Sequence, residues 1–78
     1  MNETMKTLKE ILDDIDETID YETEEHLIDD RLLDSFAIIS LVAELETEFD
    51  ISISALDMVP ENFNSMNAMA ALVDRLSN

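Results

Sequence analysis

The chain has 78 residues, which is room for one small hydrophobic core, and its apolar fraction of 46% is ordinary for a globular domain. Its charge is lopsided, because 20 Asp and Glu stand against 4 Lys and Arg and give a net charge of −16. We therefore expect a single domain over residues 1–78 that binds basic proteins, and we exclude nucleic acid as a partner, since its phosphates would be repelled.

The first element predicted is an amphipathic helix. Its apolar positions recur at helical spacing on one face: Met5, Leu8, Ile11, Leu12, Ile15 and Ile19. Asn2 or Thr4 is expected to cap its start. The segment Met1–Thr4 lacks the basic and apolar regions of a signal peptide, and no apolar run is long enough to span a membrane, so a cytoplasmic protein is expected.

A long acidic loop is predicted to follow, from about Asp20 to Asp34, where the helical periodicity fails. Loops of this length in small domains are often functional. Five apolar side chains are expected to anchor the loop on the core: Tyr21, Leu27, Ile28, Leu32 and Leu33. The chain has no glycine, so tight turns are expected to use Asn or Asp.

The second helix is predicted to begin at Asp34 or Ser35 and to run to about Phe49, because Asp34 is a favourable N-cap residue. Its core face is expected to consist of Ile38, Leu41, Val42, Leu45 and Phe49.

The same helix carries a second apolar set, formed by Phe36, Ile39 and Ala43 and centred roughly 130° from the core face. An apolar patch bordered by acidic residues is typical of a docking surface. The alternative is that Phe36 and Ile39 pack beneath the long loop.

The last third of the chain is predicted to be an extended connection, a short helical turn and a final helix. Ile51 and Ile53 are expected to point inward, Ser54 and Asp57 to form a capping box, and Pro60 to limit the turn. Ser65 or Asn64 is expected to cap the final helix, whose core face is Met66, Met69, Leu72, Val73 and Leu76. The fold class is thus all-α, a small four-helix bundle of three main helices and one short one.

Ser35 is the residue that points to chemistry. It lies at the predicted start of the second helix, where free backbone N–H groups and the helix dipole suit a phosphate ester, although a serine in this position can also serve only as a cap. The segment Leu33-Asp34-Ser35-Phe36-Ala37-Ile38-Ile39 resembles the Asp-Ser-Leu motif of acyl and peptidyl carrier proteins. The likeness extends over nearly the whole helical pattern, with Leu32 where members often have Gly and Phe36 where they have Leu.

The resemblance implies a carrier with no catalytic activity of its own. Ser35 would bear 4′-phosphopantetheine, attached by a phosphopantetheinyl transferase, and Asp34 would assist the transferase and its metal ion. The arm would hold an acyl or aminoacyl cargo, D-alanine included, as a thioester. By the same resemblance the partner-binding residues are Phe36, Ile39, Ala43, Glu44 and Glu46. The implied partners are a loading ligase and downstream transferases or synthases.

Other functions fit the sequence less well than the carrier does. A hydrolase using Ser35, His26 and Asp34 is disfavoured, because the chain has no nucleophile-elbow motif. Calcium binding by Asp14, Asp16 and Asp20 is disfavoured because an EF-hand glycine is missing, and no metal site is expected. The chain has no cysteine and one histidine, which are too few ligands for an ordinary zinc site. A non-covalent acidic adaptor remains the main alternative. We expect a monomer, since the net charge opposes self-association.

Overall fold

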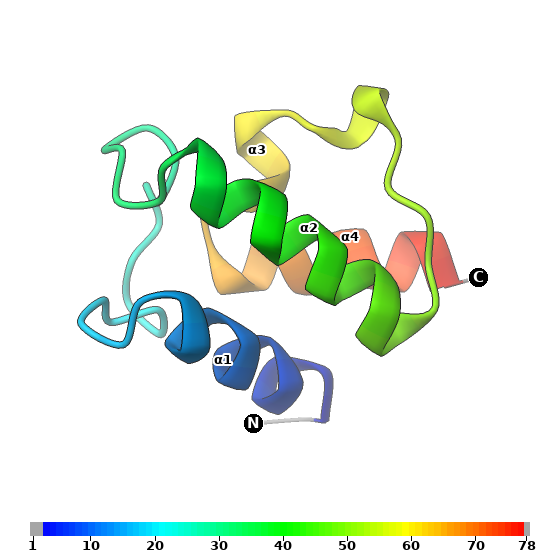
Figure 1. Cartoon of the computed structure of the whole chain (residues 1–78), viewed down its shortest axis with the longest axis horizontal. Helices are drawn as coiled ribbons and strands as arrows, with labels where there is room; N and C mark the ends of the chain where they lie inside the picture. Colours follow the sequence, from blue (N-terminus) through cyan, green and yellow to red (C-terminus); the bar gives the residue numbers. More distant parts are fainter. Residues whose placement is uncertain (1–2, 78) are drawn as a thin grey trace.

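The computed structural model describes residues 3–77, and this part of the chain contains helices and no strand, which confirms the predicted all-α bundle (Figure 1). Three helices are long and one is short. Their bounds are α1 Glu3–Ile15, α2 Ser35–Phe49, α3 Pro60–Phe63 and α4 Met66–Ser77. Contacts join α1 to α4, α1 to α2, α2 to α4 and α3 to α4. A long loop, cyan in Figure 1, leads from the end of α1 to the start of α2.

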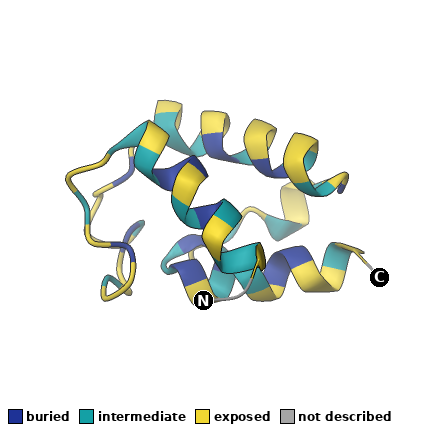
Figure 2. Ribbon diagram, turned by 90° about the horizontal axis from the view of Figure 1, so that it is seen from below, coloured by how far each residue is buried: buried dark blue, intermediate teal, exposed yellow. Residues whose placement is uncertain are grey.

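One core lies where the inner faces of the helices meet, and the outer faces are exposed (Figure 2). Leu8 and Leu12 of α1, Leu41 and Leu45 of α2, and Met69 and Leu72 of α4 are all fully buried. Every residue of the predicted α2 and α4 core faces is buried or packs against this core. The methionines of α4 therefore fill the interior, as their spacing predicts.

The beginning and the end of α1 differ from the sequence prediction. Thr4 lies inside the helix and so does not cap it, and Asn2 lies outside the described residues. The helix ends at Ile15, so Ile19 belongs to the loop, from which it still packs partly buried against the core. The helix ends before Ile19 because the segment after Ile15 forms its own local hydrogen bonds, in which the Thr18 N–H and hydroxyl donate to Asp16 Oδ1.

Tyr21 closes the C-terminal end of α1. Its buried hydroxyl donates to the carbonyl oxygens of Leu12, at 3.0 Å, and Asp16, at 2.7 Å. The Leu12 carbonyl also accepts the Asp16 N–H at 2.9 Å, whereas Asp16 follows the end of α1, where carbonyls have no partner within the helix. Tyr21 thereby fixes the direction in which the loop leaves α1.

The loop is anchored as predicted at four of five positions. Tyr21, Leu27 and Leu33 are buried, and Ile28 packs against the core. Leu32 is 39% exposed, so its predicted role as a core anchor is wrong. It lies instead along a surface groove between α1 and α2, which is described below.

Two turns adopt left-handed backbone without glycine. Asp50, with φ 53°, ends α2 and donates its N–H to the Glu46 carbonyl. Its presence in this turn agrees with the prediction that tight turns use Asn or Asp. Arg31, with φ 57°, is a left-handed residue that the sequence did not indicate. A side chain larger than glycine costs about 1–2 kcal/mol in this conformation.

The connection after α2 follows the predicted course until Pro60. Ile51 is buried and Ile53 packs against the core, and the Asp57 carboxylate accepts hydrogen bonds from the Ser54 N–H and hydroxyl, both at 3.1 Å. Ala55–Asp57 forms a single 3₁₀ turn. The prediction that Pro60 only limits this turn is incomplete, because Pro60 is also the first residue of α3, a position where its missing N–H costs nothing.

Candidate functional site

The start of α2 is fixed by Asp34. Its Oδ1 accepts the Ala37 N–H at 2.8 Å, and its carbonyl accepts the Ile38 N–H at 3.0 Å. Asp34 itself is extended, as an N-cap residue should be. The predicted N-cap is therefore confirmed, and Asp34 rather than Ser35 performs it.

Ser35 is the first residue of α2 and is exposed. In the described part of the chain its hydroxyl makes no hydrogen bond, and the backbone N–H groups of Ser35 and Phe36 have no acceptor. Because the N-terminal end of a helix carries partial positive charge, these free donors suit phosphate oxygens. The local geometry therefore fits a phosphodiester on the Ser35 oxygen: the hydroxyl is accessible, and two unused donors lie beside it.

The loop before α2 is fastened to the junction between α3 and α4 by Asn64. The side-chain oxygen of Asn64 accepts the N–H groups of Ile28, at 3.0 Å, and Asp29, at 3.1 Å, and its carbonyl accepts the Leu27 N–H at 3.0 Å. Its side-chain nitrogen donates to Asp29 Oδ2 at 3.2 Å. The cap of α4, for which the sequence offers Asn64 or Ser65, is Ser65, whose hydroxyl accepts the Ala68 N–H. A contact across so many residues leaves no local pattern in the sequence.

The second apolar set of α2 lies on the surface. Phe36 is 83% exposed and Ile39 is 65% exposed, and Ala43 is exposed as well. The alternative in which Phe36 and Ile39 pack beneath the loop is therefore wrong. We call Phe36, Ile39 and Ala43 the apolar patch.

The two acidic residues near this patch differ in their surroundings. Glu44 is exposed, and its carboxylate makes no hydrogen bond or ion pair within residues 3–77. Glu46 is half-buried, and its Oε2 accepts the Ile53 N–H at 2.8 Å. Glu46 thus holds the connection after α2 against the helix, a structural role that sequence analysis missed.

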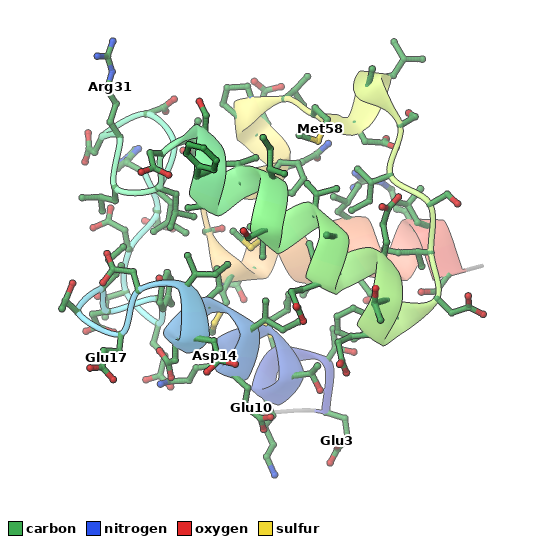
Figure 3. The ribbon with its side chains drawn as sticks, viewed as in Figure 1. Glu3, Glu10, Asp14, Glu17, Arg31 and Met58 are labelled. Carbon is green, nitrogen blue, oxygen red and sulfur yellow. The ribbon has the colours of Figure 1, made fainter. Side chains whose placement is uncertain are left out.

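Two further exposed apolar side chains lie in the segment between α2 and α3. Leu56, in the 3₁₀ turn, is 88% exposed, and Met58 is 41% exposed (Figure 3). Neither was selected from the sequence, because a single apolar residue in a turn has no periodicity to show whether it faces the core. They add apolar surface outside α2.

Two hollows lie on either side of the start of α2. The larger, of about 500 Å³, is a groove between the second half of α1 and the first half of α2. Its lining includes Asp34 and Phe36, the two neighbours of Ser35. The smaller, of about 190 Å³, lies on the α3 side, where Ile38 of α2 faces Met58 and Phe63.

The residues of the disfavoured functions do not assemble into sites. Among residues 3–77 there is no group of three or more His, Cys, Asp or Glu side chains that could hold a metal ion. Asp16 instead accepts hydrogen bonds from the Thr18 side chain and N–H, which lower the pKa of its carboxyl. His26 is exposed, and its Nδ1 lies 3.8 Å from Asp29 rather than in a hydrogen bond with Ser35. No helix within this part of the chain is long and apolar enough to cross a membrane.

The chain is similar in sequence to curated proteins named D-alanyl carrier protein. One from Lactococcus lactis subsp. cremoris (strain MG1363) is 38% identical over 72 residues, covering 85% of this chain and 91% of the relative. One from Lactobacillus acidophilus is 27% identical over 77 residues, covering 97% of this chain and 98% of the relative. One from Lactococcus lactis subsp. lactis (strain IL1403) is 43% identical over 47 residues, 60% of each chain.

Two other comparisons found nothing. No protein-family model matches the chain, and no solved structure matches it. The relatives named above therefore carry the family assignment, and the helical arrangement comes from the structure itself.

Proposed function

The chain belongs to the carrier protein family that includes the D-alanyl carrier proteins, and from that premise we propose that it carries an aminoacyl or acyl group as a thioester on a 4′-phosphopantetheine arm attached to Ser35. The observation that carries the proposal is the state of Ser35: an exposed hydroxyl with no partner in the described chain, at the first position of a capped helix. Given the names of the relatives, we propose D-alanine as the cargo.

Attachment of the arm requires an accessible oxygen nucleophile and a place for the phosphate. The Ser35 oxygen would bond to the phosphorus of coenzyme A as its pyrophosphate bond breaks, and the nucleotide would leave with the bonding electrons. The serine proton would pass to a base of the transferase. The free N–H groups of Ser35 and Phe36 would then face the phosphodiester. When attached, the arm supplies a thiol, which holds the cargo as a thioester.

Asp34 has a second role in this proposal. One oxygen, Oδ1, caps α2, while the charge of the carboxylate lies next to the serine that is modified. We propose that Asp34 also assists the transferase and its metal ion. The two roles can be separated, because capping needs an oxygen acceptor and metal binding favours a negative charge.

The partners would dock on the face of α2 that carries the apolar patch. Phe36, Ile39 and Ala43 would supply apolar contact, with Glu44 and Glu46 as acidic contacts. The net charge of −16 would steer basic surfaces of the transferase, the loading ligase and the downstream transferase or synthase toward this face. Weak, fast contacts suit a carrier that must leave each enzyme before it meets the next.

Intact mass after incubation with coenzyme A and a broad-specificity phosphopantetheinyl transferase tests the proposal. We expect the native chain to gain one phosphopantetheinyl group and Ser35→Ala to gain none. Ser40→Ala is the matched control, because Ser40 is a second exposed serine of α2 and should leave the gain intact. No gain on a folded native chain would contradict the proposal and favour the non-covalent adaptor, which would bind the same partners with Ser35→Ala.

A further inference from the structure

The larger of the two hollows beside Ser35 has a distinctive chemistry. It lies along the groove between α1 and α2, has a volume of about 500 Å³, and reaches the residues on both sides of Ser35. An arm attached to Ser35 therefore begins at the edge of this groove.

Among the described residues 3–77, carboxylates are the only charged groups that line the groove. They are Asp14, Asp16, Asp34 and Glu44, and no Lys, Arg or His side chain of these residues lines it. Two of them are already engaged, since Asp16 accepts hydrogen bonds from Thr18 and Asp34 accepts one from Ala37. The groove therefore has an uncompensated negative field, which attracts a cation.

Asp14 and Glu44 are the two carboxylates that are left for a ligand. Asp14 belongs to α1 (Figure 3) and Glu44 to α2, and both are exposed. Neither makes a hydrogen bond or an ion pair within the described part of the chain. Each therefore keeps a full set of acceptor sites for an ammonium group.

The rest of the lining is apolar except for Ser40. Its apolar residues are Ile11, Ile15, Leu32, Leu33, Phe36 and Ala37. The exposed Leu32, which the sequence predicted as a core anchor, belongs to this set. A small occupant with one positive charge and an aliphatic body would match both parts of the groove.

The hollow on the α3 side is unsuitable for such an occupant. It has a volume of about 190 Å³, and its lining contains no charged side chain: Ile28, Ile38, Met58, Val59, Pro60 and Phe63. An ammonium group moved into an apolar pocket loses its hydration without gaining a partner, which is strongly unfavourable. The two hollows therefore differ in the presence of charged side chains in their linings.

We propose that the groove between α1 and α2 is a cargo site, which holds the ammonium group of an aminoacyl thioester against Asp14 and Glu44. This inference rests on the proposed attachment of the arm to Ser35. The site is exposed, so the contact is weak, transient and sensitive to salt, as exposed ion pairs are. A cargo without the ammonium group gains nothing from the carboxylates.

A matched pair of cargoes tests the site, because D-alanyl and propionyl groups differ only by the ammonium group. Each is loaded from its coenzyme A thioester by a broad-specificity transferase, and backbone amide chemical shifts are compared by NMR at low salt. We expect the D-alanyl form alone to shift the amides of the groove, at Asp14, Ile15 and Glu44. These shifts should disappear in Asp14→Asn/Glu44→Gln and at high salt.

The control is Glu48→Gln/Glu61→Gln, which removes two exposed carboxylates outside the groove and should leave the shifts intact. Equal shifts for both cargoes, or D-alanyl shifts that persist in Asp14→Asn/Glu44→Gln, would overturn the inference while leaving the carrier function standing. Failure of coenzyme A and of both thioesters to load onto Ser35 would overturn the proposed function, and the cargo site with it.

Discussion

The N–H of Ile28 donates to the side-chain oxygen of Asn64 at 3.0 Å, across 36 positions of sequence. This bond ties the loop that leads into α2 to the junction between α3 and α4. Ile28 also lines the apolar hollow beside α2, so the same contact holds one wall of that hollow in place. The loop that leads to Ser35 is thus held by a residue that is far from it in the chain.

Asn64→Ala is predicted to destabilise the fold by about 1–3 kcal/mol, because the partly buried Ile28 N–H loses its acceptor. Asn64→Asp keeps an oxygen acceptor but places a second carboxylate near Asp29. Its stability should therefore lie between that of the native chain and that of Asn64→Ala. Urea unfolding measures both. Asn67→Ala is the control, because Asn67 is exposed on α4 and its side chain makes no hydrogen bond in the described chain. Equal stability of Asn64→Ala and Asn67→Ala would contradict the role given to Asn64.

Tyr21 is predicted to make stability fall at high pH. Burial, and then the nearby carboxylates of Asp16 and Asp13, raises the pKa of its phenol from 10.0 to about 12. The phenol pKa is higher in the folded chain than in the unfolded chain. The contribution of Tyr21 to stability is therefore complete below pH 10.0 and is lost as the pH rises through about 12. The chain has one Tyr and no Trp, so tyrosinate absorbance should report this titration directly.

Tyr21→Phe is the control for that prediction. It removes the hydrogen bonds to Leu12 and Asp16 and should cost about 1–2 kcal/mol at neutral pH. The difference in stability between the native chain and the variant should shrink as the pH rises from 10.0 through about 12. A phenol that titrates at its ordinary value in the folded chain would refute the buried, hydrogen-bonded position of Tyr21.

Substitutions at Asp34 should separate capping from loading. Asp34→Asn keeps an oxygen to accept the Ala37 N–H, so its free energy of unfolding should stay within about 0.5 kcal/mol of the native value, whereas Asp34→Ala should lose about 1 kcal/mol. Both remove the carboxylate charge, so both should be modified by the transferase more slowly. If the transferase modified Asp34→Asn at the native rate, the proposed role of Asp34 in loading would be wrong, and Asp34 would act only as the N-cap of α2.

The apolar patch should matter for docking but not for folding. Phe36→Ala and Ile39→Ala are predicted to change stability by no more than about 0.5 kcal/mol, because both side chains are largely exposed. Leu41→Ala, at a fully buried position of the same helix, should cost about 2–5 kcal/mol. Steady-state kinetics should show a higher KM of the transferase for the two patch variants. An unchanged KM would remove Phe36 and Ile39 from this interface.

The parts of the fold that the sequence predicted well are those controlled by neighbouring residues. The bounds of α2 follow from a strong N-cap at Asp34 and an apolar face that ends at Phe49. The exposure of Phe36 and Ile39 also follows, because one helix cannot bury two faces against a core on one side. Ser35 could be identified as a candidate from the sequence because the start of α2 is also set by neighbouring residues.

The parts that the sequence did not predict depend on contacts between distant segments. Asn64 and Glu46 act on backbone groups in other elements, so neither has a local signature. The left-handed conformation of Arg31 is imposed by the loop around it and runs against the preference of the residue. The groove beside Ser35 likewise exists only once α1 has packed against α2.

Peptide-level mass spectrometry of the protein isolated from the cells that make it tests the carrier function most directly. We predict that the peptide containing Ser35 bears a phosphopantetheinyl group, part of it with a further aminoacyl mass that hydroxylamine releases while the arm remains. A Ser35 peptide without this group, in protein purified intact from growing cells, would contradict the carrier function.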